Sequence, residues 1–312
     1  MNVVLLFPGQ GSQKPGMAKD LVEAFPEARA VFERADSVLE SSLSRVCFDG
    51  PADELTLTHN AQPALLAHGA AVWAIVRPRL ERHVRAAAGH SLGEFTAYHA
   101  AGTLTLDDAL KLVRRRGELM YESGVKRPGA MAAIMGDLAQ PIEAVCERAS
   151  AEAGLVSPAN YNAPGQIVIS GEVAGVERAM AIAREAGAKR AIRLTVSGAF
   201  HSALMETALG GLSQAIATTD FIDPRFPVYA NVNAAPVRDA AQARHLLLEQ
   251  LTRPVRWTDE VAAIAGGFPD SLFVEMGPGS VLTGLMRKIA PSVKTTTCGT
   301  AAEVNQLLEL AA

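Results

Sequence analysis

Short apolar runs alternate along the chain with segments whose apolar residues recur at helical spacing, which is the pattern of an α/β protein. The first run, Asn2 to Phe7, is apolar at nearly every position, as expected of a strand buried on both faces of a sheet. We predict a short strand over 84–88 and helices over 28–39 and 61–76. The second helix is expected to stop at Pro78.

The chain from about residue 128 to 197 has a pattern of its own. Its elements follow the order β-α-β-β-α-β, the split βαβ arrangement of a ferredoxin-like unit. The strands are predicted over 130–135, 156–159, 166–170 and 189–196, and the helices over 138–153 and 173–186. After His201 the alternation that opens the chain resumes, with strands predicted over 227–230 and 272–275 and a helix over 240–251. We therefore predict a discontinuous large α/β subdomain, 1–127 with 198–312, and an inserted small subdomain, 128–197.

Gly89-His90-Ser91-Leu92-Gly93 fits the G-x-S-x-G pattern of a nucleophile elbow, a sharp turn from strand to helix that presents a serine hydroxyl. The strand predicted over 84–88 precedes this motif, and a segment of helical composition follows it. The Leu92 N–H would then lie at the start of a helix, where it can donate to an oxyanion. The alternative is a serine that only caps a helix.

A serine nucleophile needs a base, and the chain has seven histidines. His201 stands out because it follows a predicted strand and precedes a helix, where α/β folds place site residues. His90 lies inside the elbow, and we expect it to point away from Ser91. The remaining five lie in ordinary helical or loop sequence, and we interpret them as surface or structural residues: His59, His68, His83, His99 and His245.

The helix predicted over 105–122, with Thr105 as its N-cap, carries three consecutive arginines. Arg115 faces solvent and Arg114 lies on a flank, whereas Arg116 falls on the edge of the apolar stripe. A guanidinium turned inward must find an anion or several acceptors. Two interpretations remain: a structural ion pair within the protein, or a clamp for a substrate carboxylate.

Composition narrows the class of protein. The 312 residues are 49% hydrophobic and 20% charged, which excludes a disordered chain. The net charge of −4 and an aromatic content of 5% give no sign of nucleic-acid binding. No apolar run is long enough to span a membrane, and the N-terminus does not resemble a signal peptide. We expect a cytoplasmic protein, and no feature calls for more than a monomer.

The three cysteines, Cys47, Cys146 and Cys298, are too scattered for a zinc site. We expect buried thiols in a reducing compartment and no bound metal.

Six motifs occur in order over nearly the whole chain. They are Pro8-Gly9-Gln10-Gly11-Ser12-Gln13, the elbow, Arg116-Gly117, Asn162-Ala163-Pro164-Gly165-Gln166, Gly198-Ala199-Phe200-His201-Ser202 and Gly277-Pro278-Gly279. Together they resemble the malonyl-CoA:acyl carrier protein transacylase family, which includes the acyltransferases of polyketide synthases. The resemblance covers about residues 3 to 310. It implies an α/β-hydrolase-like large subdomain with an inserted ferredoxin-like one, in agreement with the two parts above.

The resemblance also implies catalytic roles. Ser91 would accept the acyl group and His201 would act as its base. The N–H groups of Gln10 and Leu92 would form the oxyanion hole. The backbone carbonyl of Gln250 would orient the histidine, so that a dyad replaces the Ser-His-Asp triad.

Three further residues are assigned to substrate by the same resemblance. Arg116 would bind the free carboxylate of a malonyl group. Phe200 would lie beside the α-carbon, because a phenylalanine at the matching place goes with malonyl in related polyketide acyltransferases. Asn162 would lie in a loop that lines the cleft between the subdomains.

The implied substrates are malonyl-CoA and the phosphopantetheine thiol of an acyl carrier protein, with no bound cofactor. The motifs fit fatty-acid and polyketide synthesis equally. A serine esterase or thioesterase is the alternative, and a non-catalytic binding module is a weaker one because Ser91, His201 and Arg116 are all present. Two basic groups are candidates for carrier docking: Lys111 with Arg114 and Arg115, and Arg287 with Lys288.

Overall fold

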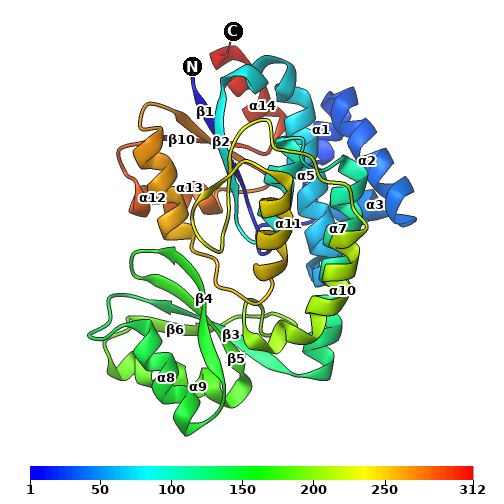
Figure 1. Ribbon diagram of the computed structural model, residues 1–312. Coiled ribbons are helices and arrows are strands. Elements are labelled where there is room, and N and C mark those ends of the chain that lie inside the picture. The colour runs from blue at the N-terminus through cyan, green and yellow to red at the C-terminus, as the bar shows by residue number, and fades with distance from the viewer. Residues whose placement is uncertain (312) are drawn as a thin grey trace.

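The computed structural model describes residues 1–311, and Figure 1 shows two parts, each with its own sheet. The larger sheet has six strands in the order β10-β9-β1-β2-β7-β8, and the smaller has four in the order β4-β5-β3-β6. Helices cover the larger sheet, while α8 and α9 pack together in the smaller part. The predicted α/β fold with an inserted ferredoxin-like unit is confirmed.

The larger sheet is mainly parallel, and β1 is its buried centre. β1 pairs in parallel with β2 and β9, and every residue of β1 is buried. β8 lies antiparallel to β7 at one edge. The strands are β1 (Val3–Phe7), β2 (Val84–Gly89), β7 (Val228–Tyr229), β8 (Pro236–Val237), β9 (Leu272–Met276) and β10 (Lys294–Cys298). Because parallel strands end at the same edge, the loops after β1, β2 and β7 converge there.

The helices of the large subdomain are α1 (Lys19–Ala24), α2 (Pro26–Leu39), α3 (Leu43–Asp49), α4 (Ala52–Thr56), α5 (Thr58–Leu80), α6 (Leu92–Ala100), α7 (Leu106–Lys126), α10 (Glu206–Ala217), α11 (Ala240–Glu249), α12 (Trp257–Gly267), α13 (Val281–Ile289) and α14 (Ala301–Leu310). The prediction that the helix around 61–76 stops at Pro78 is wrong. α5 continues to Leu80 because it packs against α2, α6 and α7, and this burial outweighs the hydrogen bond that a proline removes.

The small subdomain has the predicted order of elements: β3 (Gly129–Met135), α8 (Ile142–Glu152), β4 (Val156–Ala163), β5 (Gln166–Glu172), α9 (Val173–Glu185) and β6 (Arg190–Arg193). We propose that the small subdomain spans residues 128–197. β4 is longer than predicted because it forms a hairpin with β5 through the tight Pro164-Gly165 turn. Asn162 therefore lies on a strand, and the expectation of a loop at this position is wrong.

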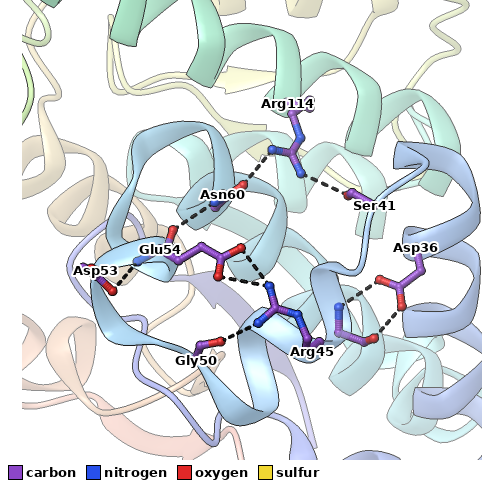
Figure 2. Close-up of polar contacts among 9 residues, drawn as sticks. Asp36, Ser41, Arg45, Gly50, Asp53, Glu54, Asn60 and Arg114 are labelled. Atoms are coloured by element: carbon purple, nitrogen blue, oxygen red, sulfur yellow. Dashed lines mark hydrogen bonds and ion pairs between the residues drawn. The ribbon is translucent and has the colours of Figure 1, made fainter.

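Two arginines link helices α3, α4, α5 and α7 (Figure 2). Arg114 of α7 donates to Asn60 Oδ1 at 2.8 Å and to Ser41 Oγ at 3.4 Å. Arg45 of α3 donates to both carboxylate oxygens of Glu54, at 2.9 and 3.0 Å. Arg114 is thus a structural link between α7 and its neighbours.

Within residues 1–311, no helix is long and apolar enough to cross a membrane. Cys47, Cys146 and Cys298 are buried and unpaired, and burial raises the pKa of each thiol to about 12. The prediction of buried thiols is confirmed.

Candidate active site

Ser91 stands between the end of β2 and the start of α6, as the elbow motif predicts. Its φ of 53° lies in the left-handed region, which costs about 1–3 kcal/mol for a residue with a side chain. The flanking glycines permit the turn. A Cβ on Gly89 would lie 1.9 Å from the carbonyl carbon of Gly93, and a Cβ on Gly93 would lie 2.1 Å from the Phe7 oxygen.

His201 faces the serine directly. Its Nε2 lies 2.8 Å from Ser91 Oγ, and its Nδ1 lies 2.8 Å from the backbone oxygen of Gln250. Because a carbonyl only accepts, Nδ1 carries the proton and donates to Gln250, which leaves the Nε2 lone pair facing the serine O–H. Burial, and then the nearby Arg116 charge, lower the pKa of His201 to about 3. The histidine is therefore neutral and able to accept a proton.

Arg116 reaches the same point from α7, with only 1% of its surface exposed. Nη1 donates to Gln62 Oε1 at 2.8 Å, and Nη2 donates to Gln250 Oε1 at 2.9 Å and to Ser91 Oγ at 3.1 Å. Burial lowers the pKa of Arg116 to about 10, so the guanidinium stays charged at neutral pH. Within residues 1–311 no carboxylate forms an ion pair with it. The interpretation of Arg116 as one half of a structural ion pair therefore has no support.

Two backbone N–H groups lie beside the serine without an acceptor among the described residues, those of Gln10 and Leu92. Leu92 is the first residue of α6, and its N–H has no partner within the helix. Gln10 lies in the loop after β1. The parallel register that pairs Phe7 with Gly89 brings this loop beside the elbow. Two such donors are what a developing oxyanion requires.

These groups line one cavity of about 370 Å³. Ser91, His201, Arg116, Gln10 and Leu92 all face it, and the buried ring of Phe200 forms part of its boundary. The small subdomain completes the boundary with an apolar surface made by Met131, Val168 and Leu194, which we call the wall.

Asn162, also at the cavity, accepts a hydrogen bond from the elbow's histidine. Its Oδ1 lies 2.8 Å from His90 Nε2, so the imidazole donates to the amide oxygen. His90 thus points to the small subdomain. This contact joins the two subdomains at the edge of the site.

The chemistry of the cavity favours an anionic or oxygen-rich ligand. The Gln10 and Leu92 N–H groups and the guanidinium of Arg116 are hydrogen-bond donors at one nucleophile, and a carboxylate bound beside Ser91 Oγ would meet that guanidinium. Among residues 1–311, no three side chains of His, Cys, Asp or Glu gather as metal ligands would.

Several residues that support the site were missed by sequence reasoning. Gln62 holds Arg116 in place, and its signal was a polar residue in the mainly apolar segment 61–76. Asn231, Glu94 and Glu260 form a fully buried network behind the elbow. Burial raises the pKa of Glu94 to about 7 and that of Glu260 well above its ordinary value. Nothing in the local sequence marks Asn231.

Known proteins resemble this chain over nearly its full length. A family model described as "Acyl transferase domain" matches residues 4–304. A "Malonyl CoA-acyl carrier protein transacylase" of Bacillus subtilis is 46% identical over 300 residues, covering 94% of this chain and 92% of that protein. An acyl-carrier-protein-S-malonyltransferase structure from Bartonella henselae superposes with a TM-score of 0.95 at 44% identity, covering 100% and 99% of the two chains. A malonyl-transacylase solved in complex with its type II PKS acyl-carrier protein gives 0.94 at 39% identity, covering 99% and 100%.

Proposed function

The chain belongs to the acyl transferase domain family as one of its malonyl CoA-acyl carrier protein transacylases, and from this premise we propose a two-step reaction carried by Ser91 and His201. The enzyme transfers a malonyl group from malonyl-CoA to acyl carrier protein, its protein partner, and so serves fatty-acid or polyketide synthesis. The steps and the residue roles below are our proposal.

In the first step Ser91 Oγ attacks the thioester carbon of malonyl-CoA, and the neutral His201 takes the hydroxyl proton through Nε2. The N–H groups of Gln10 and Leu92 stabilise the tetrahedral oxyanion. The carbon–sulfur bond then breaks, and His201 returns its proton to the leaving thiolate, so that free CoA departs. Gln250 keeps the imidazole in the tautomer that this proton transfer needs.

In the second step the phosphopantetheine thiol of the carrier protein attacks the malonyl-serine ester. His201 now takes the thiol proton and gives it to Ser91 Oγ as the ester breaks. The order is ping-pong, because CoA leaves before the carrier thiol reacts. No step calls for a group beyond these side chains and the two substrates.

One observation carries this proposal: a buried, charged guanidinium without an ion-pair partner among residues 1–311 lies 3.1 Å from the nucleophile. Malonyl differs from neutral acyl groups in its free carboxylate, and Arg116 provides the matching bidentate donor. A general serine esterase, the alternative, has no use for a buried cation at this point.

The test is covalent trapping of the acyl-enzyme. Incubation with labelled malonyl-CoA and no carrier is expected to leave a base-labile label on the peptide that contains Ser91, and Ser91→Ala should remove it. The same acyl-enzyme should pass its label to a carrier thiol much faster than to water. Label that persists in Ser91→Ala would refute the nucleophile, and preferential transfer to water would favour the hydrolase alternative.

A further inference from the structure

The backbone of Ser91 is held from behind by two side-chain amides that come from distant parts of the chain. Its N–H donates to Asn231 Oδ1 at 2.8 Å, and its carbonyl accepts from Gln250 Nε2 at 2.9 Å. Both amides are completely buried. A left-handed φ at a residue with a Cβ persists only where the surroundings hold it, and these contacts hold both polar groups of the peptide backbone.

The orientation of the Asn231 amide is fixed by its other contacts. Nδ2 donates to the Gly89 carbonyl at 2.8 Å and to Glu260 Oε2 at 2.9 Å. Both partners are acceptors, so a flipped amide would turn its oxygen toward two oxygens and its NH₂ group toward the Ser91 N–H. Glu260 therefore decides which end of Asn231 meets the nucleophile, although it lies outside the cavity.

Gln250 is oriented in the same manner by groups of opposite charge. Nε2 donates to Glu94 Oε2 at 2.7 Å, while Oε1 accepts from Arg116 Nη2 at 2.9 Å. Glu94 Oε2 also accepts the backbone N–H of Asn231, at 3.1 Å. The two amides thus share one carboxylate, and they connect the serine, the histidine and the arginine of the site to a single buried network.

We propose that Asn231 is a positioning residue for the nucleophile and that Glu260 sets its orientation. The inference rests on the proposed role of Ser91. Asn231 touches neither substrate nor reacting atoms; it acts by holding the Ser91 peptide in the geometry that directs Oγ toward His201 and leaves the following N–H, that of Leu92, free for the oxyanion. Its place two residues after β7 brings it to the edge where β1 and β2 deliver the other groups.

The experiment measures nucleophile reactivity without malonyl recognition. A small alkyl fluorophosphonate reacts with an activated serine: the Oγ–P bond forms, fluoride leaves, and His201 takes the hydroxyl proton. We expect Asn231→Leu to lower the rate of Ser91 labelling by about 100-fold, the cost of an ångström-scale misplacement. In single-turnover acylation by malonyl-CoA the loss should fall on the rate constant and leave KM nearly unchanged.

Two variants separate positioning from general support of the fold. Asn231→Asp keeps an oxygen that can accept from the Ser91 N–H, but its second oxygen faces the Gly89 carbonyl and Glu260. It can therefore hold the same contacts only while either the new carboxyl or that of Glu260 is protonated. Its labelling rate should therefore fall further behind that of the parent enzyme as pH rises. Adding Glu260→Gln restores a donor opposite the new carboxylate, and most of the loss at high pH should be recovered.

The matched control is Glu275→Gln. Glu275 is another buried carboxylate, and it accepts hydrogen bonds from the N–H groups of Leu282 and Thr283 at the start of α13. This variant should lower thermal stability without changing the labelling rate. The proposal is wrong if Asn231→Asp is labelled like the parent at every pH, if Glu260→Gln rescues nothing, or if Glu275→Gln slows labelling equally. Failure of the parent enzyme to be labelled at Ser91 would instead refute the proposed nucleophile.

Discussion

The two subdomains contribute to the cavity in different ways. The large subdomain supplies reactive and positioning groups from the ends of parallel strands: Gln10 follows β1, Ser91 follows β2, and Asn231, which holds the Ser91 backbone, follows β7. The small subdomain supplies the wall from Met131 and Val168, which lie within its strands, and from Leu194, which follows β6. Strand ends can aim backbone N–H groups and short side chains at one point, whereas a sheet face offers a broad apolar surface. We therefore expect bond making to depend on the large subdomain alone, and the fit of the acyl group to depend on the wall as well as on Arg116 and Phe200 of the large subdomain.

The largest effect is expected at the base. His201→Ala removes the proton acceptor 2.8 Å from Ser91 Oγ and should slow acylation by about 10²–10⁴-fold. The loss should be the same for malonyl-CoA and acetyl-CoA, because the base does not contact the part in which they differ. Single-turnover acylation with both substrates measures this, and a loss confined to one acyl group would break the comparison.

The pH dependence of acylation sharpens the same point. The pKa of His201 is lowered to about 3, so the base stays unprotonated as pH falls through 6.5, the ordinary range of a histidine. The acidic limb of kcat/KM for acylation should therefore lie well below pH 6.5. A limb near pH 7 that disappears in Glu94→Gln would belong to Glu94, whose pKa is raised to about 7. A limb at 6.5 that persists in this variant would show that His201 titrates normally.

Arg116→Ala should separate selection from bond making within the large subdomain. Transfer of malonyl should lose about 2–5 kcal/mol of transition-state stabilisation, as when one partner of a buried charge pair is truncated. Transfer of acetyl should fall much less, because acetyl has no carboxylate to pair with the guanidinium. The ratio of kcat/KM for the two acyl groups measures the difference, and equal losses would mean that Arg116 is structural.

Substitution of Phe200 tests whether the boundary of the cavity limits the size of the acyl group. Its ring is buried beside the site, and Phe200→Ser should make room for the additional methyl group of methylmalonyl. A single methyl group is worth about 1–3 kcal/mol in such a pocket, so the preference for malonyl should narrow rather than reverse. The malonyl to methylmalonyl ratio of kcat/KM reports it. An unchanged ratio would assign this selection to the wall instead.

The smallest effect concerns docking of the carrier protein. Arg287 and Lys288 lie on α13, and Lys288 donates to Gln166 of the small subdomain and shares a surface hollow of about 420 Å³ with Lys189 and Arg190. Reversing both residues to Glu should raise KM for the carrier several-fold and leave acylation by malonyl-CoA intact, with less effect at high salt.

The matched control for docking is reversal of Lys111 and Arg115, the other basic group. Arg115 already pairs with Glu118 and Glu122, at 3.1 and 3.7 Å, and Arg114 is omitted because it links helices. We expect little change in KM for the carrier. If this pair has the larger effect, the carrier docks against α7 rather than at the junction of the subdomains.

Local spacing was sufficient for much of the fold. The order of elements in the small subdomain, the strand–turn–helix at Ser91 and the helix that carries Arg116 were all predicted, because each depends on residues close together in sequence. The errors arose where spacing alone does not decide: the helix continues through Pro78 because α5 packs against other helices, and β4 is extended by its hairpin pairing with β5. Gln250 was reached only through resemblance to a family, since no pattern links it to His201.

The sequence by itself determined which residues have the chemistry for acyl transfer: a serine between close-packing glycines, a histidine between a predicted strand and a helix, and an arginine on an apolar stripe. Only the tertiary structure decided how these groups are held. Asn231 lies 140 residues from Ser91 and Gln250 lies 159 residues from it, yet their amides contact its backbone. The physical reason is that a strained, buried turn needs hydrogen-bond partners on every side, and the chain can supply them only from segments that folding brings together.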